Sequence, residues 1–206
     1  SNTDSAGKFL TTVQAYIYSS GEIILYSMAN LIYAPQDSSY LFSNSTSSNR
    51  LTSLTSITFD NFNTSNVTDM QYMFSGCSSL TRLDILNFTI GSSTNVTNML
   101  IGMTSLKTFV APNTLGKDLT LPSTNFVDTS LAVGSRVLTD TVSATDDGKT
   151  FKFGYTLTAD ANGGALSIAS GWTVASDKLT ATKIVLFDET IGNFPTATRT
   201  GYTFSK

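Results

Sequence analysis

A short apolar motif recurs at a constant interval, and it limits the folds that this chain can adopt more than any other feature. The motif occupies residues 54–57 (Leu-Thr-Ser-Ile), and it returns at residues 80–83 (Leu-Thr-Arg-Leu) and 106–109 (Leu-Lys-Thr-Phe). Both intervals are 26 residues long. A fixed period of this length indicates that one structural element is repeated along the chain.

The agreement between the repeats extends beyond the motif. Residues 74–80 share an apolar-x-Gly-apolar-polar-Ser-Leu pattern with residues 100–106. Residues 66–70 match residues 95–99 if three residues are inserted in the second repeat and three are deleted after the match. A period of 26 residues falls within the range of leucine-rich repeats. One such repeat cannot bury its own apolar face, so we expect neighbouring repeats to stack.

The spacing of apolar residues predicts two elements in each repeat. The first and fourth residues of the motif are apolar, which predicts a short strand that points both of them inward. Four more apolar residues follow at spacings of three and four: Met70, Met73, Phe74 and Cys77. This spacing predicts a helical turn that faces the same core. Residues 40–44 resemble residues 73–76 and are expected to be a degenerate copy of that segment.

The segments on both sides of the repeats predict β-structure. Residues 13–18 and 23–26 are rich in β-branched and aromatic side chains and flank a Ser-Gly turn, which predicts a hairpin. Residues 31–33 are expected to add another strand. Residues 150–157 alternate as a strand does, and turn residues occur at 146–148 and 160–164. We therefore expect an α+β, mostly β fold: a short leucine-rich-repeat solenoid flanked by β-rich capping segments.

The residues from Asn61 to Phe88 carry a family resemblance. They resemble the N-V-T-x-M-x-x-M-F-x-G-C-x-S-L-x-x-L-x-L repeat of BspA-like surface proteins and related surface lipoproteins. The resemblance covers about residues 38–122 and departs from the family at Met103, where Cys is usual, and at the spacer 90–94. It implies a solenoid with a strand-lined face on secreted or wall-anchored bacterial proteins or lipoproteins, some of them linked to adhesion. It implies no catalytic residue.

The C-terminal residues carry a second resemblance. Residues 183–188 and 199–204, with a glycine and a proline between them, are similar to the start of a Listeria-Bacteroides (internalin B-type) repeat. This resemblance implies a piece of a longer modular surface protein. The expected organisation has four parts: an N-terminal β-hairpin cap (1–37), the BspA-like leucine-rich-repeat block (38–122), a β-rich module (123–182) and a truncated repeat (183–206).

The composition favours an extracellular protein and argues against two classes of partner. Only 13% of the residues are charged, against roughly 25% in ordinary soluble proteins. The net charge of −3 leaves no basic face to neutralise phosphates, so nucleic acid is not an expected partner. No apolar run approaches the ~20 residues of a membrane span. The opening residues lack the features of a signal peptide, so any export signal is expected to have been removed.

The absence of histidine argues against an enzyme. Without histidine, Ser-His-Asp and Cys-His arrangements and histidine-dependent zinc sites cannot form. No phosphate-binding glycine motif is present. We expect no catalytic residue, no cofactor and no metal site. Cys77 is expected to be a small buried hydrophobe, and the acidic or amide residues that might suggest calcium are expected to be turn residues: Asp146, Asp147, Asp160 and Asn162.

A binding surface is the remaining positive hypothesis. The candidates are exposed polar positions beside the repeat strands, together with Tyr72: Thr55, Ser56, Thr81, Arg82, Lys107 and Thr108. Expected partners are host or neighbouring-cell surface proteins or glycans, bound by a monomer at the bacterial cell surface. The alternative is a structural spacer without a ligand, whose polar residues are the solvated half of alternating strands. An exposed Tyr72 would favour binding, and a flat Ser/Thr surface would favour the spacer.

Overall fold

The fold is seen in a computed structural model that describes residues 13–17, 21–27, 31–43 and 53–202. The chain forms two compact units, unit 1 (residues 1–124 and 140–151) and unit 2 (residues 125–139 and 152–206). Within the described residues the regular structure is β-strand, apart from one 3₁₀ turn at Val133–Ser135. The mostly β prediction is confirmed, and its α component is absent from the described part. No helix there is long and apolar enough to cross a membrane.

The strands of unit 1 are short. They are β1 (Val13–Ile17), β2 (Glu22–Ser27), β3 (Ile32–Tyr33), β4 (Ser56–Thr58), β5 (Phe62–Asn63), β6 (Arg82–Asp84), β7 (Thr89–Ile90), β8 (Thr108–Val110), β9 (Thr114–Leu115), β10 (Leu119–Thr120) and β12 (Thr141–Val142). The strand β13 (Thr150–Asp160) begins in unit 1 and continues in unit 2. The predicted hairpin is present as β1 and β2, although residues 18–20 lie outside the described part. The predicted strand at 31–33 is present as β3.

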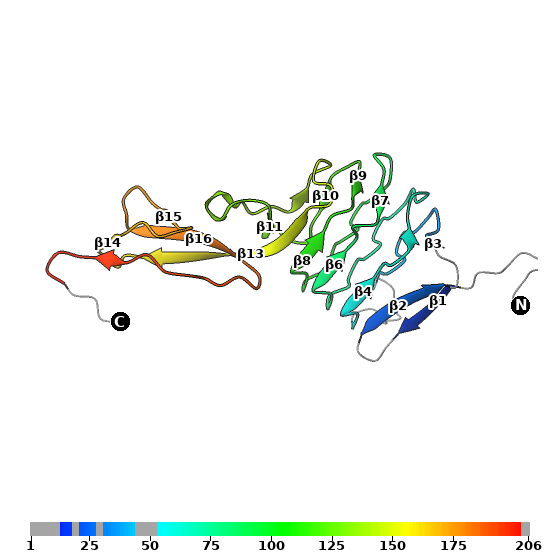
Figure 1. The fold of residues 1–206 in the computed structure, drawn as a ribbon, viewed down its shortest axis with the longest axis horizontal. Coiled ribbons are helices and arrows are strands. Elements are labelled where there is room, and N and C mark those ends of the chain that lie inside the picture. The colour runs from blue at the N-terminus through cyan, green and yellow to red at the C-terminus, as the bar shows by residue number, and fades with distance from the viewer. Residues whose placement is uncertain (1–12, 18–20, 28–30, 44–52, 203–206) are drawn as a thin grey trace, which may run out of the picture. The chain divides into compact units, whose positions relative to one another are not determined.

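Parallel strand pairs join some of the successive elements of unit 1, whereas β4 and β6 lie in different sheets (Figure 1). Ile23 of β2 lies opposite Ile57 of the motif strand β4, and Leu83 of the motif strand β6 lies opposite Phe109 of the motif strand β8. A second series of parallel pairs joins β3 to β5 and β7 to β9. Ile57, Leu83 and Phe109 are buried, so the motif forms the predicted inward-pointing strands.

The segment after each motif strand is a series of tight turns, and the predicted helical turn is wrong. Met73 and Cys77 donate their amides to carbonyls three residues earlier, whereas Phe74 and Gly76 donate to carbonyls of the next repeat. A helix needs every amide to bond along its own axis. The positive φ angles of Tyr72 (56°) and Gly76 (74°) also interrupt a right-handed path. The spacing of three and four nevertheless identified buried residues correctly, since all four apolar side chains are inaccessible to solvent.

The 26-residue register continues through the turns, so the predicted insertion and deletion are wrong. Asp69 forms a parallel bridge with Asn95, so Asn95 corresponds to Asp69 and not to Asn66. The two side chains make equivalent hydrogen bonds: Asp69 Oδ1 accepts the Gln71 amide (2.8 Å) and Asn95 Oδ1 accepts the Thr97 amide (3.1 Å). Asp and Asn are interchangeable in such turns because either carbonyl-type oxygen accepts the bond.

A degenerate repeat precedes the first complete one, as predicted from residues 40–44. The ring of Tyr40 stacks on Tyr72 with centroids 4.9 Å apart, and Phe42 stacks on Phe74 at 5.4 Å. The amide of Phe42 also donates to the next repeat. The prediction is therefore confirmed for residues 40–43, and Asn44 lies outside the described residues.

An aromatic cluster forms the centre of the repeat core. The ring of Phe59 contacts four other rings with centroid distances between 4.9 and 5.8 Å: Phe42, Phe62, Phe74 and Phe88. These rings come from three successive repeats. All five side chains are at least 94% buried, so they join the repeats into one core.

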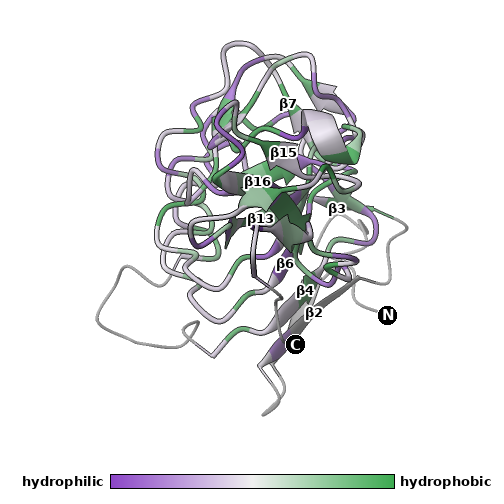
Figure 2. Ribbon diagram, turned by 90° about the vertical axis from the view of Figure 1, so that its left-hand side faces the viewer, coloured by the Kyte–Doolittle hydropathy of each residue, from purple (hydrophilic) through white to green (hydrophobic). Residues whose placement is uncertain are grey.

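Unit 2 is an antiparallel arrangement. Its strands are β11 (Phe126–Asp128), β14 (Ala165–Leu166), β15 (Thr173–Val174), β16 (Thr180–Leu186), β17 (Ala197–Thr198) and the greater part of β13. β16 pairs with β13 on one side and β15 on the other, and β14 pairs with β17. Both β13 and β16 carry hydrophobic segments (Figure 2). Trp172 is buried in a small core with Ala161, Leu166 and Ala181. The strand predicted at 150–157 is confirmed and extends to Asp160.

Candidate binding groove on unit 1

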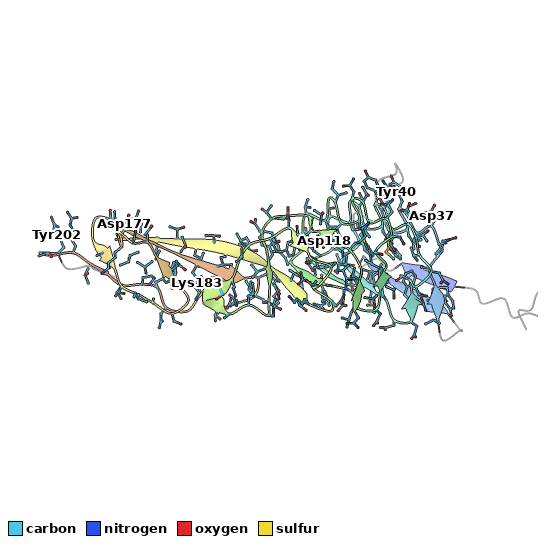
Figure 3. The ribbon with its side chains drawn as sticks, turned by 90° about the horizontal axis from the view of Figure 1, so that it is seen from above. Asp37, Tyr40, Asp118, Asp177, Lys183 and Tyr202 are labelled. Carbon is cyan, nitrogen blue, oxygen red and sulfur yellow. The ribbon has the colours of Figure 1, made fainter. Side chains whose placement is uncertain are left out.

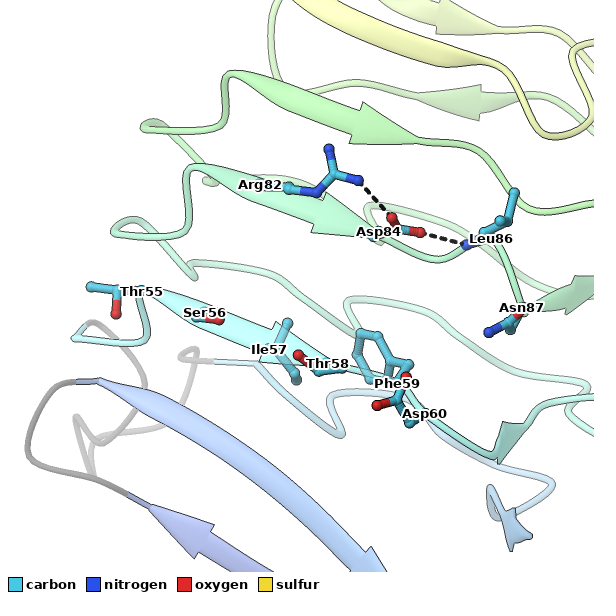
Figure 4. Close-up of a pocket in the computed structure, with 10 residues that line it drawn as sticks. All are labelled: Thr55, Ser56, Ile57, Thr58, Phe59, Asp60, Arg82, Asp84, Leu86 and Asn87. Atoms are coloured by element: carbon cyan, nitrogen blue, oxygen red, sulfur yellow. Dashed lines mark hydrogen bonds and ion pairs between the residues drawn. The ribbon is translucent and has the colours of Figure 1, made fainter. Parts of the chain in front are cut away.

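A groove of about 360 Å³ crosses the outer face of two neighbouring repeats in unit 1 (Figure 4). Its lining residues come from β4, β6 and the segments that follow each strand: Thr55, Ser56, Ile57, Thr58, Phe59, Asp60, Arg82, Asp84, Leu86 and Asn87. Most of these side chains are polar, and the buried Ile57 and Phe59 lie beneath them. The groove therefore offers hydrogen-bonding groups over an apolar floor.

Strand alternation explains why polar side chains collect there. Ile57 and Leu83 point into the core, so the residues on either side of them point outward. Ser56 and Thr58 on β4 are exposed, as is Arg82 on β6. Within the described residues, β4 and β6 belong to different sheets and no ladder of hydrogen bonds joins them. The groove thus follows a break between two strands that the 26-residue period brings side by side.

The charged groups of the groove are available to a ligand. Arg82 Nη2 lies 2.6 Å from Asp84 Oδ2, and the two side chains are 56% and 41% exposed. An exposed ion pair of this kind contributes about 0–1 kcal/mol, so a ligand can replace it at little cost. Asp60 and Asn87 add an exposed carboxylate and an exposed amide. The groove can donate and accept hydrogen bonds, and it can interact with a positive or a negative group of a ligand.

The structure brings three of the predicted strand-face residues together in the groove. Thr55, Ser56 and Arg82 line it. Thr81 is exposed and Lys107 is half-buried, and neither lines the groove. Thr108 lies opposite Arg82 in the β6–β8 pair but is only 8% exposed, so the expectation of an exposed side chain is wrong there. The reason is that β8 has strands on both sides, β6 and β13.

Tyr72 lies on the stack of turns and not in the groove. Its ring is half-buried against Tyr40, which is labelled in Figure 3, and its hydroxyl accepts a 2.8 Å hydrogen bond from Asn98 Nδ2. The three residues occupy equivalent positions of successive repeats, and all have positive φ angles. Tyr72 is therefore part of the contact between repeats. It is not the freely exposed aromatic side chain that would have favoured a binding function.

Several lining residues were not predicted from the sequence. Thr58 and Asp84 follow the predicted candidates Ser56 and Arg82 by two residues, so strict alternation along each strand would have found them. Asp60 and Asn87 lie beyond the strand ends. No sequence signal separates them from ordinary turn residues.

The predicted turn residues have structural partners. Asp147 Oδ1 accepts the Leu115 amide and Asp160 Oδ1 accepts the Asn162 amide, at 2.8 and 2.7 Å. Asp146 accepts the Ser143 amide at 2.8 Å and a bond from a lysine. The local contacts of Asp146 and Asp160 confirm the prediction of turn chemistry for these two residues, whereas Asp147 bonds an amide 32 residues away. In the described part, no group of three or more His, Cys, Asp or Glu side chains is arranged to hold a metal ion.

Cys77 is a core residue, as predicted. Its side chain is fully buried, and its thiol donates to the Phe42 carbonyl oxygen at 3.0 Å. Desolvation by burial raises the pKa of the Cys77 thiol from 9.0 to about 12. The reactive thiolate is therefore almost absent from the folded protein at neutral pH.

Cys77 is expected to react with a thiol reagent at pH 8 at least about 100-fold more slowly in the native protein than in denaturant. Because its pKa is raised, the Cys77 thiol keeps its proton to a higher pH in the folded state than in the unfolded state. Stability from this group is therefore full below pH 9.0 and is lost as pH rises from there toward about 12. Time-resolved labelling with and without urea measures the ratio. Equal rates under the two conditions would contradict the burial of Cys77.

A family model matches part of the chain. Residues 36–114 match a family model described as "Mycoplasma protein of unknown function, DUF285". Neither the comparison with curated proteins nor that with solved structures found a match. All of the residues that line the groove lie inside the matched segment. The repeats that form the groove are thus similar to a bacterial family of unknown function.

Proposed function

We propose that this chain is a non-catalytic part of a bacterial cell-surface protein and that it binds its ligand through the groove on unit 1. The observation that carries the proposal is the groove itself, where exposed polar side chains of two successive repeats surround a common space. Repeat proteins bind in this way, because stacking places equivalent residues side by side on one extended face.

The repeats are proposed to form a short leucine-rich-repeat solenoid of the BspA-like type. The parallel pairing of β2 with β4 and of β6 with β8 supports this interpretation, as does the constant 26-residue register. The resemblance between the run from Asn61 to Phe88 and the BspA-like repeat supports an extracellular location and a role in adhesion. The low charge and the abundance of Ser, Thr and Asn agree with that location.

The chemistry of the groove favours a ligand with many hydrogen-bonding groups, such as a glycan or a polar protein surface. Hydroxyls of Ser56 and Thr58, the Asn87 amide and the ion pair of Arg82 supply donors and acceptors. The net charge of −3 gives little long-range attraction. We therefore expect the affinity to depend only weakly on salt concentration.

Binding of the purified chain to an array of matrix proteins and glycans tests the proposal. Thr58→Val and Arg82→Ala are each expected to weaken binding by about tenfold or more, since each removes a hydrogen-bonding group that a ligand would use. Thr120→Val is the matched control, because Thr120 is an exposed strand threonine outside the groove. Saturable binding that is unchanged in both groove variants would place the ligand elsewhere.

The second candidate function is a spacer that displays other domains. The burial of Thr108 and the engagement of Tyr72 with Tyr40 and Asn98 favour it, because they reduce the exposed face available to a ligand. Binding to no member of the array would support the spacer.

The salt dependence of binding is a further test. A steep loss of affinity between low and physiological salt would indicate electrostatic attraction and contradict binding by shape and hydrogen bonds.

A further inference from the structure

Unit 2 contains a second cavity, of about 220 Å³, whose chemistry differs from that of the groove. Two cationic side chains, Arg136 and Lys183, line it. Its other polar lining consists of the hydroxyl residues Thr156, Thr173 and Thr182, and no carboxylate lines it. A cavity with this lining attracts anions, which is unusual in a chain of net charge −3.

Arg136 has more hydrogen-bond donors than partners. Its side chain is 8% exposed, and Nη1 bonds the Glu189 carboxylate (2.6 Å) and the Ile184 carbonyl oxygen (3.3 Å). Nε is buried and has no hydrogen-bond partner among the described residues. Buried donors are nearly always paired. The Nε–Nη2 edge of a guanidinium is a fork that matches two oxygens of one oxyanion.

Glu189 forms an ion pair with Arg136. Burial raises the pKa of Glu189, but hydrogen bonds from Arg136 and the Leu186 amide, with the charges of Arg136 and Lys183, outweigh this effect and hold the pKa below its usual value. Glu189 is therefore ionised at neutral pH, and its Oε2 accepts the hydrogen bond from Arg136 Nη1. The carboxylate thus orients the guanidinium and leaves Nε without a partner in the described part of the chain.

The strand register gathers the three hydroxyl residues. Thr173 lies opposite Thr182 in the β15–β16 pair, and Thr156 lies opposite Ile184 in the β13–β16 pair. Thr182 and Ile184 are two residues apart on β16, so all four side chains share one face. The backbone of Gly171 comes close to Lys183, which is labelled in Figure 3: a Cβ built there would lie 3.5 Å from its Nζ.

We propose that this cavity binds a tetrahedral oxyanion, either as free sulfate or phosphate or as the sulfate ester of a polysaccharide. The Arg136 guanidinium donates to two of the oxygens and the threonine hydroxyls donate to the others. Lys183, whose Nζ also donates to the Ile191 carbonyl oxygen at 2.7 Å, supplies a second positive charge. The site is independent of the groove, since every residue that lines it belongs to unit 2. It gives the chain an anion-dependent contact that its overall charge does not suggest.

Titration calorimetry of the whole chain at low ionic strength tests the proposal with three probes: sodium sulfate, sodium phosphate and a sulfated disaccharide. Sodium chloride at matched ionic strength is the salt control. Thr182→Val keeps the Arg136–Glu189 pair and removes one hydroxyl, and it is expected to weaken binding of the preferred probe at least fivefold. Thr180→Val is the matched control, because Thr180 is exposed on the same strand and outside the cavity.

The outcomes separate the possible sources of the anion. Saturable binding of sulfate or phosphate with the expected variant pattern supports a free ion, whereas binding of the disaccharide at least tenfold tighter than sulfate supports a sulfated polysaccharide. Arg136→Lys keeps the charge and removes the guanidinium fork. It is expected to weaken binding of the free ion or of the disaccharide by at least tenfold. Binding of none of the three probes, or equal effects of Thr182→Val and Thr180→Val, would overturn the proposal.

Discussion

Replacing Phe74 with alanine is expected to lower the free energy of unfolding of unit 1 by about 3–5 kcal/mol. The side chain is fully buried, and its ring contacts Phe59 of its own repeat and Phe42 and Phe88 of the two neighbouring repeats. Truncation therefore leaves a cavity where successive repeats meet, and not inside one of them. A loss of this size is a large part of the roughly 5–15 kcal/mol that stabilises a typical domain.

Urea unfolding followed by circular dichroism measures the loss. Ile101→Ala is the control, because Ile101 lies in the same stack of turns but is 50% exposed, and we expect it to cost less than about 1 kcal/mol. Phe74→Leu, which keeps most of the volume, should fall between the two variants. If Phe74→Ala costs no more than Ile101→Ala, the aromatic cluster does not hold the repeats together.

The stacking of repeats could be predicted from the sequence because it depends on periodicity. The motif leucines and their partners recur every 26 residues, and a residue whose neighbours in both adjacent repeats are apolar is bound to be buried. The same argument identified the degenerate copy, in which Phe42 takes the place of Phe74. Turn and strand chemistry at the flanks also followed from local composition, as in the strand that begins at Thr150.

The conformation of the turns could not be predicted in the same way. Spacings of three and four fit a helix and a run of tight turns equally well, because both return the chain to one face after a few residues. What decides between them is the direction of alternate amides, such as those of Phe74 and Gly76, which bond to the next repeat. That choice depends on contacts between repeats and leaves only faint signs in the sequence, such as the glycine at position 76.

The candidate sites, too, could be predicted from the sequence only in part. Thr55 and Arg82 were found from the alternation of each strand, but their meeting in one groove depends on the break between β4 and β6. The anion cavity of unit 2 was not foreseen at all. Arg136 and Lys183 are far apart in the sequence, and only the antiparallel register of three strands brings the lining together. No motif of fixed spacing marks such a site.

Trp172→Ala is expected to destabilise unit 2 by about 3–5 kcal/mol. Trp172 is 6% exposed in a small core that otherwise contains two alanines and a leucine, so its ring supplies most of the buried apolar area there. The ring also lies 5.4 Å from that of Phe194, and Nε1 donates a 3.0 Å hydrogen bond to the Asn193 carbonyl oxygen. One substitution therefore removes both the core of the unit and the bond that holds the segment after β16.

Hydrogen exchange measures this effect separately for each unit. Amides of β16, such as that of Ala181, should lose protection in Trp172→Ala, whereas Ile168→Ala, at a side chain that is 89% exposed, should leave them unchanged. Trp172→Phe keeps an aromatic ring and loses the hydrogen bond, so its expected cost is smaller, about 1–2 kcal/mol. If Trp172→Ala and Ile168→Ala have equal effects on β16, the core of unit 2 lies elsewhere. The arrangement of Arg136 and the threonines, which rests on the same strand, would then have to be reconsidered.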